Sequence, residues 1–197
     1  MVRTALLARF RERWLSGALP LVVEHRPGEA EHVCAAPSLW MGARELALEL
    51  SARCEAGGPD GPALFLDLQP GVRWVQALVA GLRVGATVHF EAPAPGGAWA
   101  VTEECLVHKA APANDERPGP GHSAAALTEQ ALGLAGRLNP GAVALLDVSR
   151  PVPAPVLLAA LHDEAELHLT ADPGSVHALT RGVSPDVVHL HRSREPR

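Results

Sequence analysis

The sequence is poor in aromatic residues and in cysteine. Its 197 residues include no tyrosine, and aromatic side chains make up 4% of them, so a buried core has to be built from Leu, Val and Ala. The three cysteines, Cys34, Cys54 and Cys105, lie far apart and form no CxxC pair. Such a sparse, odd set is typical of reduced thiols rather than of a disulfide framework. We therefore expect a cytoplasmic protein.

Long apolar runs and an excess of basic charge are missing as well. No uninterrupted apolar segment approaches the roughly 20 residues that a membrane-spanning helix needs. The arginine-rich residues 1–13 have the pattern of an amphipathic helix and not of a signal peptide. The net charge of −5 argues against nucleic-acid binding, which needs a basic face. We expect no membrane span and no nucleic-acid partner.

What the sequence does contain is an alternation of helical and extended patterns. Apolar residues at helical spacing predict helices over residues 4–16, 38–54, 72–83, 123–138, 155–162 and 173–181. Short apolar runs bounded by turn residues predict strands at 19–25, 31–35, 62–68, 86–90, 142–148, 166–170 and 187–190. This order predicts an α/β fold with a mainly parallel sheet of repeated βαβ units flanked by helices, after a small N-terminal helix and hairpin.

Residues 91–121 differ from the rest because proline and glycine gather at both ends of the segment. We interpret them as an insertion or linker that carries one short element, at 98–108. The chain then divides into three parts. Residues 1–90 form a first α/β subdomain, 91–121 the insertion, and 122–197 a second subdomain in the same sheet or packed against it.

Two blocks of the chain resemble the start of the acyl-CoA synthetase and adenylation-domain (AMP-binding) superfamily. In the first block the likeness lies in the residues Glu45–Leu50, the turn Gly57–Asp60, the apolar run Ala63–Asp67 and the segment Trp74–Val88. In the second block it lies in residues 122–138, 141–148 and 157–169. The resemblance covers most of the chain and implies a truncated, degenerate N-terminal part of an acyl-activating enzyme.

The sequence departs from this family where the family binds phosphate. The resemblance implies a loop of the form TSGTTG-x-PKG just before residue 122, whose backbone N–H groups, hydroxyls and lysine hold the nucleotide phosphates. Residues 113–121 instead read ANDERPGPG, with no Thr or Lys and with two acids that would repel a triphosphate. Residues for Mg²⁺ or an acyl-adenylate are not visible either. We expect no cofactor.

Two functions remain open. The first is a non-catalytic accessory protein that binds a partner, such as a synthetase, a carrier protein, another biosynthetic enzyme or a second copy of this chain. The alternative is a small enzyme or ligand-binding domain for an acyl, carboxylate or nucleotide ligand. The missing phosphate loop favours the first, and so argues against enzymatic activity.

Polar side chains at two predicted strand ends are candidates for binding such a ligand. Asp67 and Gln69 lie at the end of one predicted strand, and Ser149 and Arg150 lie at the end of another. In open α/β sheets, ligands bind beyond the carboxyl ends of the strands. Arg150 would clamp a carboxylate there, or else form a surface salt bridge.

A further candidate lies at the predicted start of a helix. His122 and Ser123 precede the helical pattern, and an anion would bind at such an N-terminus. The alternative role for this pair is an ordinary helix cap.

The histidines of the last two predicted strands offer a metal site. His189 and His191 alternate along one strand and so share a face, and His168 would join them from a neighbouring strand. Imidazoles gathered in this way would ligate Zn²⁺. The alternative is that they are polar side chains on a solvent-facing strand. A serine hydrolase has no support, because no GxSxG motif occurs.

Overall fold

The structure is a computed structural model, and it describes residues 2–17, 21–26, 28–53, 61–93, 95–109, 118–149, 153–171 and 188–189. Its helices are α1 (Val2–Ser16), α2 (Ala36–Arg53), α3 (Val72–Val84), α4 (Ala124–Leu134) and α5 (Ala154–His162). Its strands are β1 (Leu21–His25), β2 (His32–Ala35), β3 (Ala63–Leu66), β4 (Thr87–His89), β5 (Trp99–Val101), β6 (Leu106–His108), β7 (Gly121–Ser123), β8 (Val143–Asp147), β9 (Glu166–Thr170) and β10 (Val188–His189). The predicted α/β class is confirmed. The helix predicted at 173–181 lies outside the described residues.

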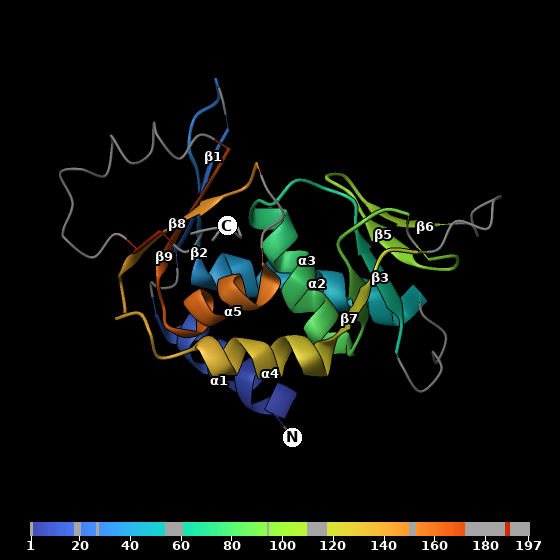
Figure 1. Cartoon of the computed structure of the whole chain (residues 1–197), viewed down its shortest axis with the longest axis horizontal. Helices are drawn as coiled ribbons and strands as arrows, with labels where there is room; N and C mark the ends of the chain where they lie inside the picture. Colours follow the sequence, from blue (N-terminus) through green and yellow to red (C-terminus); the bar gives the residue numbers. More distant parts are fainter. Residues whose placement is uncertain are drawn as a thin grey trace, which may run out of the picture.

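The strands form two sheets rather than one. One sheet has the order β10-β8-β9-β1-β2 and the other the order β6-β5-β3-β4-β7. Most neighbouring strands are parallel, and the antiparallel pairs are β1–β2, β4–β7 and β5–β6. Figure 1 shows the two sheets at opposite ends of the molecule, with the helices gathered between and beside them. The predicted N-terminal hairpin is β1–β2, and it joins the first sheet by pairing β1 with β9.

Part of the segment 91–121 belongs to a sheet. Strands β5 and β6 form an antiparallel hairpin, and β5 pairs in parallel with β3. The prediction of one element over 98–108 was one strand too few, because a tight turn divides it. At this turn the Cys105 N–H donates to Thr102 Oγ1 at 3.2 Å. The division of the chain at 91–121 stays a prediction, although β1 pairs with β9, a strand that follows that segment in the sequence.

Local capping sets where α4 begins and where α3 ends. Ser123 Oγ accepts the Ala126 N–H at 3.2 Å, so Ser123 is the N-cap of α4 and the capping role is confirmed. Helix α2 begins at Ala36, two residues before the start that the sequence predicts. At the end of α3, Gly85 adopts a φ of 76°, the left-handed region that favours glycine at a helix C-terminus.

A buried carboxylate on β1 forms a hydrogen bond to the start of α3. Glu24 on β1 is 6% exposed, and its Oε2 accepts the Val72 N–H at 3.1 Å at the start of α3. A negative charge is stabilised at a helix N-terminus. Gly71, the residue before α3, leaves room for this contact, since a Cβ there would lie 2.6 Å from Glu24 Oε1.

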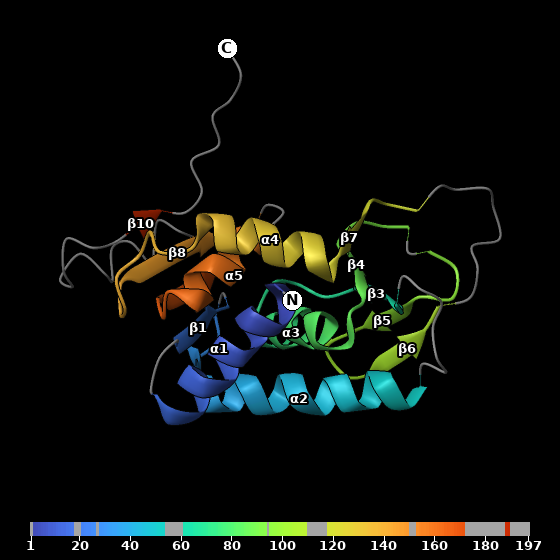
Figure 2. The ribbon, with the colours of Figure 1, turned by 90° about the horizontal axis from the view of Figure 1, so that it is seen from below.

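The core is built mainly from Leu, Val and Ala, as the composition predicts. Helix α1 packs against both α2 and α4, and in Figure 2 it lies between them. Its inward side chains include Phe10 and Trp14, whose rings stack with centroids 4.5 Å apart. Trp14 also meets Trp40 of α2 edge to face, with centroids 6.3 Å apart. None of the described helices is long and apolar enough to cross a membrane.

Candidate functional site

The first predicted ligand residues lie at the end of β3. Asp67 is held in place, because its Oδ2 accepts the Lys109 ammonium at 2.9 Å and its N–H donates to the Val101 carbonyl at 3.0 Å. Gln69 is exposed two residues further on. The Asp67 carboxylate therefore joins the end of β3 to the β5–β6 hairpin by an ion pair.

The second predicted pair lies at the end of β8, which belongs to the other sheet. Both the N–H and the hydroxyl of Ser149 donate to Asp147 Oδ1, the former at 2.9 Å. Arg150 lies outside the described residues. Because β3 and β8 belong to different sheets, Asp67 and Ser149 do not share a sheet edge. Their role in binding a ligand stays a prediction.

His122 lines a cavity of about 360 Å³. The residue lies on β7 with its ring against Phe90, the centroids being 5.4 Å apart. Apolar side chains supply most of the wall, and His122, Glu91 and Gln130 add polar groups. The other lining residues are Phe90, Pro120, Leu127, Pro153, Ala154 and Pro155. The cavity therefore has the mixed lining that suits a small, largely apolar ligand.

His168 of the predicted metal site pairs with a histidine that the sequence analysis did not single out. Its Nδ1 lies 2.8 Å from His25 Nε2, and its Nε2 lies 2.9 Å from Glu166 Oε1. The two imidazole rings stack with centroids 5.1 Å apart. The parallel pairing of β1 with β9 brings them together, since His168 is the register partner of Val23 and His25 lies two residues further along β1, on the same face of the sheet. Both ring nitrogens of His168 are thus within hydrogen-bond distance of protein groups.

His25 is poorly suited to carrying a positive charge. Burial and then the neighbouring His168 lower the pKa of His25, while Glu31, 3.4 Å from its Nδ1, acts in the opposite direction. His189 lies on β10, with β8 between it and the strand of His168. His191 lies outside the described residues. Within the described part of the chain, no three His, Cys, Asp or Glu side chains gather as metal ligands, and the zinc site stays a prediction.

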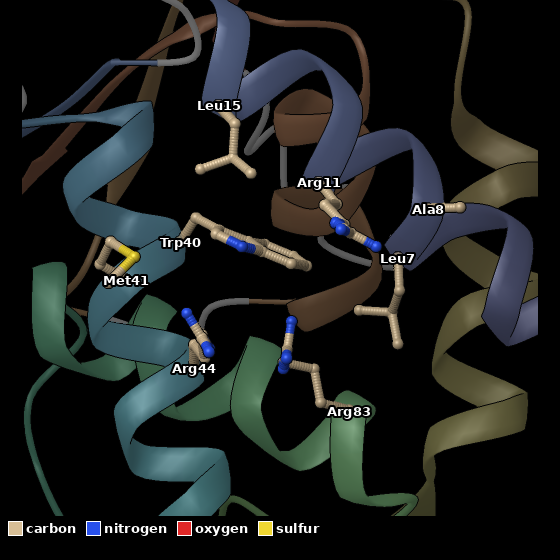
Figure 3. Close-up of a pocket in the computed structure, with 8 residues that line it drawn as sticks. All are labelled: Leu7, Ala8, Arg11, Leu15, Trp40, Met41, Arg44 and Arg83. Carbon is tan, nitrogen blue, oxygen red and sulfur yellow. The ribbon is translucent and has the colours of Figure 1, made fainter.

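A larger groove lies on the outside of three helices. It has a volume of about 660 Å³ and lies between α1 and α2, with α3 at its base (Figure 3). Three arginines, one from each helix, reach into it, and the remaining lining is mainly apolar. The lining residues are Leu7, Ala8, Arg11, Leu15, Trp40, Met41, Arg44 and Arg83. We call this feature the basic groove.

The basic groove concentrates positive charge around one indole. The Arg83 guanidinium lies 4.4 Å from the centre of the Trp40 ring, in a cation–π contact. Burial, followed by the charges of Arg44 and Arg11, lowers the pKa of Arg83. Among the described residues, no carboxylate forms an ion pair with Arg11, Arg44 or Arg83. The net charge of the chain is −5, so the groove differs in sign from the protein as a whole.

The sequence did not predict the basic groove, because its three arginines lie on three separate helices. The available signal was the spacing of Leu7, Arg11 and Leu15, which places two large apolar residues and a cation on one face of α1. Arg44 and Arg83 are far apart in the sequence. Only the packing of α2 on α3 brings them to α1.

The two-sheet fold with α1–α5 is similar to that of solved fatty acyl-adenylate ligases and of N-terminal subdomains of related structures. A fatty acyl-adenylate ligase from L. pneumophila, solved with acyl adenylate and pyrophosphate, matches 90% of this chain with a TM-score of 0.64 and 13% identity. The inhibitor-bound N-terminal domain of FACL13 from Mycobacterium tuberculosis matches 89% with a TM-score of 0.62 and 12% identity. The NpsA N-terminal subdomain from Klebsiella oxytoca, bound to 3-hydroxybenzoyl-AMSN, matches 94% with a TM-score of 0.55 and 14% identity.

These matches show the fold that the sequence resemblance predicted. The chain spans 42%, 61% and 57% of the lengths of those three proteins. No family model and no curated protein matches the sequence. The ligands bound to the solved structures belong to those proteins, and at such low identity the likeness carries no activity over to this chain.

Proposed function

We propose that this chain is a non-catalytic accessory protein with an AMP-binding-enzyme-like fold, and that it acts by binding a protein partner. The observation that carries the proposal is that Lys109, the single lysine of the sequence, is already in an ion pair. Its ammonium forms an ion pair with Asp67 and is not presented by a phosphate loop. The sequence contains no second lysine that could serve in a phosphate loop.

The electrostatics around the expected phosphate loop support this proposal. Binding a triphosphate needs converging N–H donors and cations, since the ligand carries several negative charges. The sequence at 113–121 offers Asp115 and Glu116 and a single arginine, Arg117. Residues 113–117 lie outside the described part of the chain, and their composition alone argues against ATP as a ligand.

An adenylation assay tests the proposal directly. We expect no acid-dependent pyrophosphate exchange when the chain is incubated with ATP, Mg²⁺ and a panel of fatty and aromatic acids. We also expect ATP to leave the melting temperature unchanged, because a ligand stabilises only the state that binds it. An active acyl-activating enzyme serves as the positive control. Pyrophosphate exchange with any acid of the panel would refute the non-catalytic assignment.

Partner binding needs its own measurement. Cross-linking in the native cells should recover one recurrent protein, and light scattering on the two purified proteins should give a defined complex. Light scattering on the chain alone shows whether a second copy is the partner. A monomer that forms no complex with the recovered protein would contradict the proposal.

The cavity beside His122 favours a second candidate function, a binding domain for a small, largely apolar acyl ligand. If the chain has this function, an uncharged acyl compound such as a medium-chain ester should raise the melting temperature, and the rise should grow with the ligand concentration. Leu127→Trp would fill the cavity and should remove that shift, whereas Glu129→Gln, on the exposed side of α4, should keep it. A shift that survives Leu127→Trp places the ligand elsewhere.

A further inference from the structure

We propose that the basic groove between α1 and α2 docks an acidic, amphipathic helix of a protein partner. The inference rests on the proposed function, and it names the surface and the chemistry of the partner.

Charge is the first argument. Arg11, Arg44 and Arg83 converge on one groove, and none of them forms an ion pair with a described carboxylate. Arginine presents a planar fork of donors that matches a carboxylate in two parallel hydrogen bonds. Three such forks around Trp40 are complementary to a row of acidic side chains. Like charges held together without counter-charges are unfavourable in the free protein, so an acidic partner relieves their repulsion.

The apolar residues along the groove are the second argument. Leu15 is 51% exposed and Met41 is 42% exposed, and they lie on α1 and α2 at opposite sides of the groove. On α2, Met41, Arg44 and Leu48 follow at intervals of three and four residues and so lie along one face. Leu48 is 60% exposed and continues this face beyond the groove. An extended apolar line alternating with cations suits a ligand that is itself long and amphipathic.

The shape of the groove selects a helix over other anions. A groove between two packed helices receives an amphipathic helix through apolar residues spaced at i, i+3, i+4 and i+7. A stacked nucleotide base would need an open aromatic face, but Trp40 is only 5% exposed, with Arg83 over its ring and Trp14 perpendicular to it. Nucleic acid would need a far more basic surface than a chain of net charge −5 provides.

A neighbouring groove on the other side of α2 would set the orientation of the partner helix. It has a volume of about 570 Å³, and Glu45 and Glu49 line it together with Arg73 and Gln76. Met41 belongs to both grooves. The partner helix should therefore present acids to the basic groove, and a basic side chain where it crosses Met41 toward Glu45. Such complementary charges fix orientation and register more than they add affinity.

The test uses the full chain and a synthetic peptide as the probe. The peptide, on the order of 20 residues so that it can form a helix, carries leucines on one face and glutamates beside them. A second peptide replaces each glutamate by lysine. Fluorescence anisotropy should show that the glutamate peptide binds and that the lysine peptide does not. Binding should weaken as salt is raised from 50 to 500 mM, values chosen because added salt shortens the Debye length.

Charge-reversal variants locate the contact. Arg44→Glu and, on the other helix, Arg11→Glu should each weaken glutamate-peptide binding by about tenfold or more, because a repulsive pair replaces an attractive one. Arg53→Glu is the matched control, since it makes the same charge change on α2 at a residue already paired with Glu49. Arg11, Arg44 and Arg53 are exposed, and unchanged melting curves should confirm that the variants fold.

Each other outcome overturns the inference. Equal binding of both peptides, no binding of the glutamate peptide, or an equal loss in Arg53→Glu would show that the groove does not select an acidic helix. Displacement of the peptide by inorganic phosphate or by anionic phosphatidylserine vesicles would assign the groove to phosphate or lipid. If the cross-linked partner binds Arg44→Glu as well as the unchanged chain, the groove inference fails while the accessory function stands. Pyrophosphate exchange would remove the accessory function instead.

Discussion

Replacing Trp14 by alanine should lower the free energy of unfolding by about 3–5 kcal/mol, the range seen for large aromatic side chains removed from protein cores. Trp14 is 1% exposed. It stacks on Phe10 and meets the edge of Trp40, so its removal leaves a cavity at the junction of α1 and α2. Urea unfolding followed by far-ultraviolet circular dichroism measures the change.

Two matched variants make this result interpretable. Trp14→Phe keeps an aromatic ring and should recover a large part of the lost stability. Leu15→Ala alters the adjacent side chain, which is 51% exposed, and should change stability by no more than about 0.5 kcal/mol. A loss below about 1 kcal/mol for Trp14→Ala would contradict the burial of this side chain. Because Trp14 supports Trp40, the variant should also weaken peptide binding at the basic groove.

The sequence predicted most helices and strands because their signals are local. The helix over α3 was placed within one residue, since Val72, Val75, Leu78, Val79 and Leu82 recur at helical spacing and Gly85 ends it. The split of 98–108 into β5 and β6 was missed. Each of these strands has three residues, and Thr102–Cys105 gives no strong turn signal. The second sheet was missed for a related reason, because strand pairing is a long-range property that periodicity does not report.

The candidate sites were harder to predict than the elements. Asp67 was correctly placed at a strand end, but its ion pair with Lys109 depends on the β5–β6 hairpin, which the sequence did not show. His168 was singled out, whereas its neighbour His25 lies 143 residues away in the sequence and meets it only through the β1–β9 pairing. Contacts between distant segments decide which polar residues converge, and one sequence alone carries no record of them.

The Asp163 carboxylate should be the most important single acid for stability. It follows α5 and accepts backbone N–H groups of three consecutive residues: Gly136 at 2.7 Å, Arg137 at 3.0 Å and Leu138 at 3.1 Å. His162 Nδ1 lies 3.0 Å from Asp163 Oδ1, the oxygen that also accepts the Gly136 N–H. Asp163→Ala would leave these donors without their acceptor, and hydrogen bonds to a charged group contribute about 1.5–3 kcal/mol. We expect a loss of about 3 kcal/mol in the free energy of unfolding.

The pH dependence of this loss in the free energy of unfolding shows whether Asp163 stabilises the fold through its charge or only through packing. Burial alone would raise the pKa of Asp163, but the hydrogen bonds from His162 and from the three backbone N–H groups outweigh it and leave the pKa lowered. A carboxylate with a lowered pKa in the folded state contributes its stability above its unfolded pKa, about 3.9, and loses it as the pH falls through the lower, folded value. The difference in the free energy of unfolding between the unchanged chain and Asp163→Asn should therefore be constant from pH 7 to about pH 5 and shrink below about pH 4.

Asp67→Asn, at an exposed ion pair, is the control and should change stability by at most about 1 kcal/mol. A difference for Asp163→Asn that grows on acidification would mean that the pKa is raised in the folded protein, and that the N–H groups of residues 136–138 do not stabilise the charge.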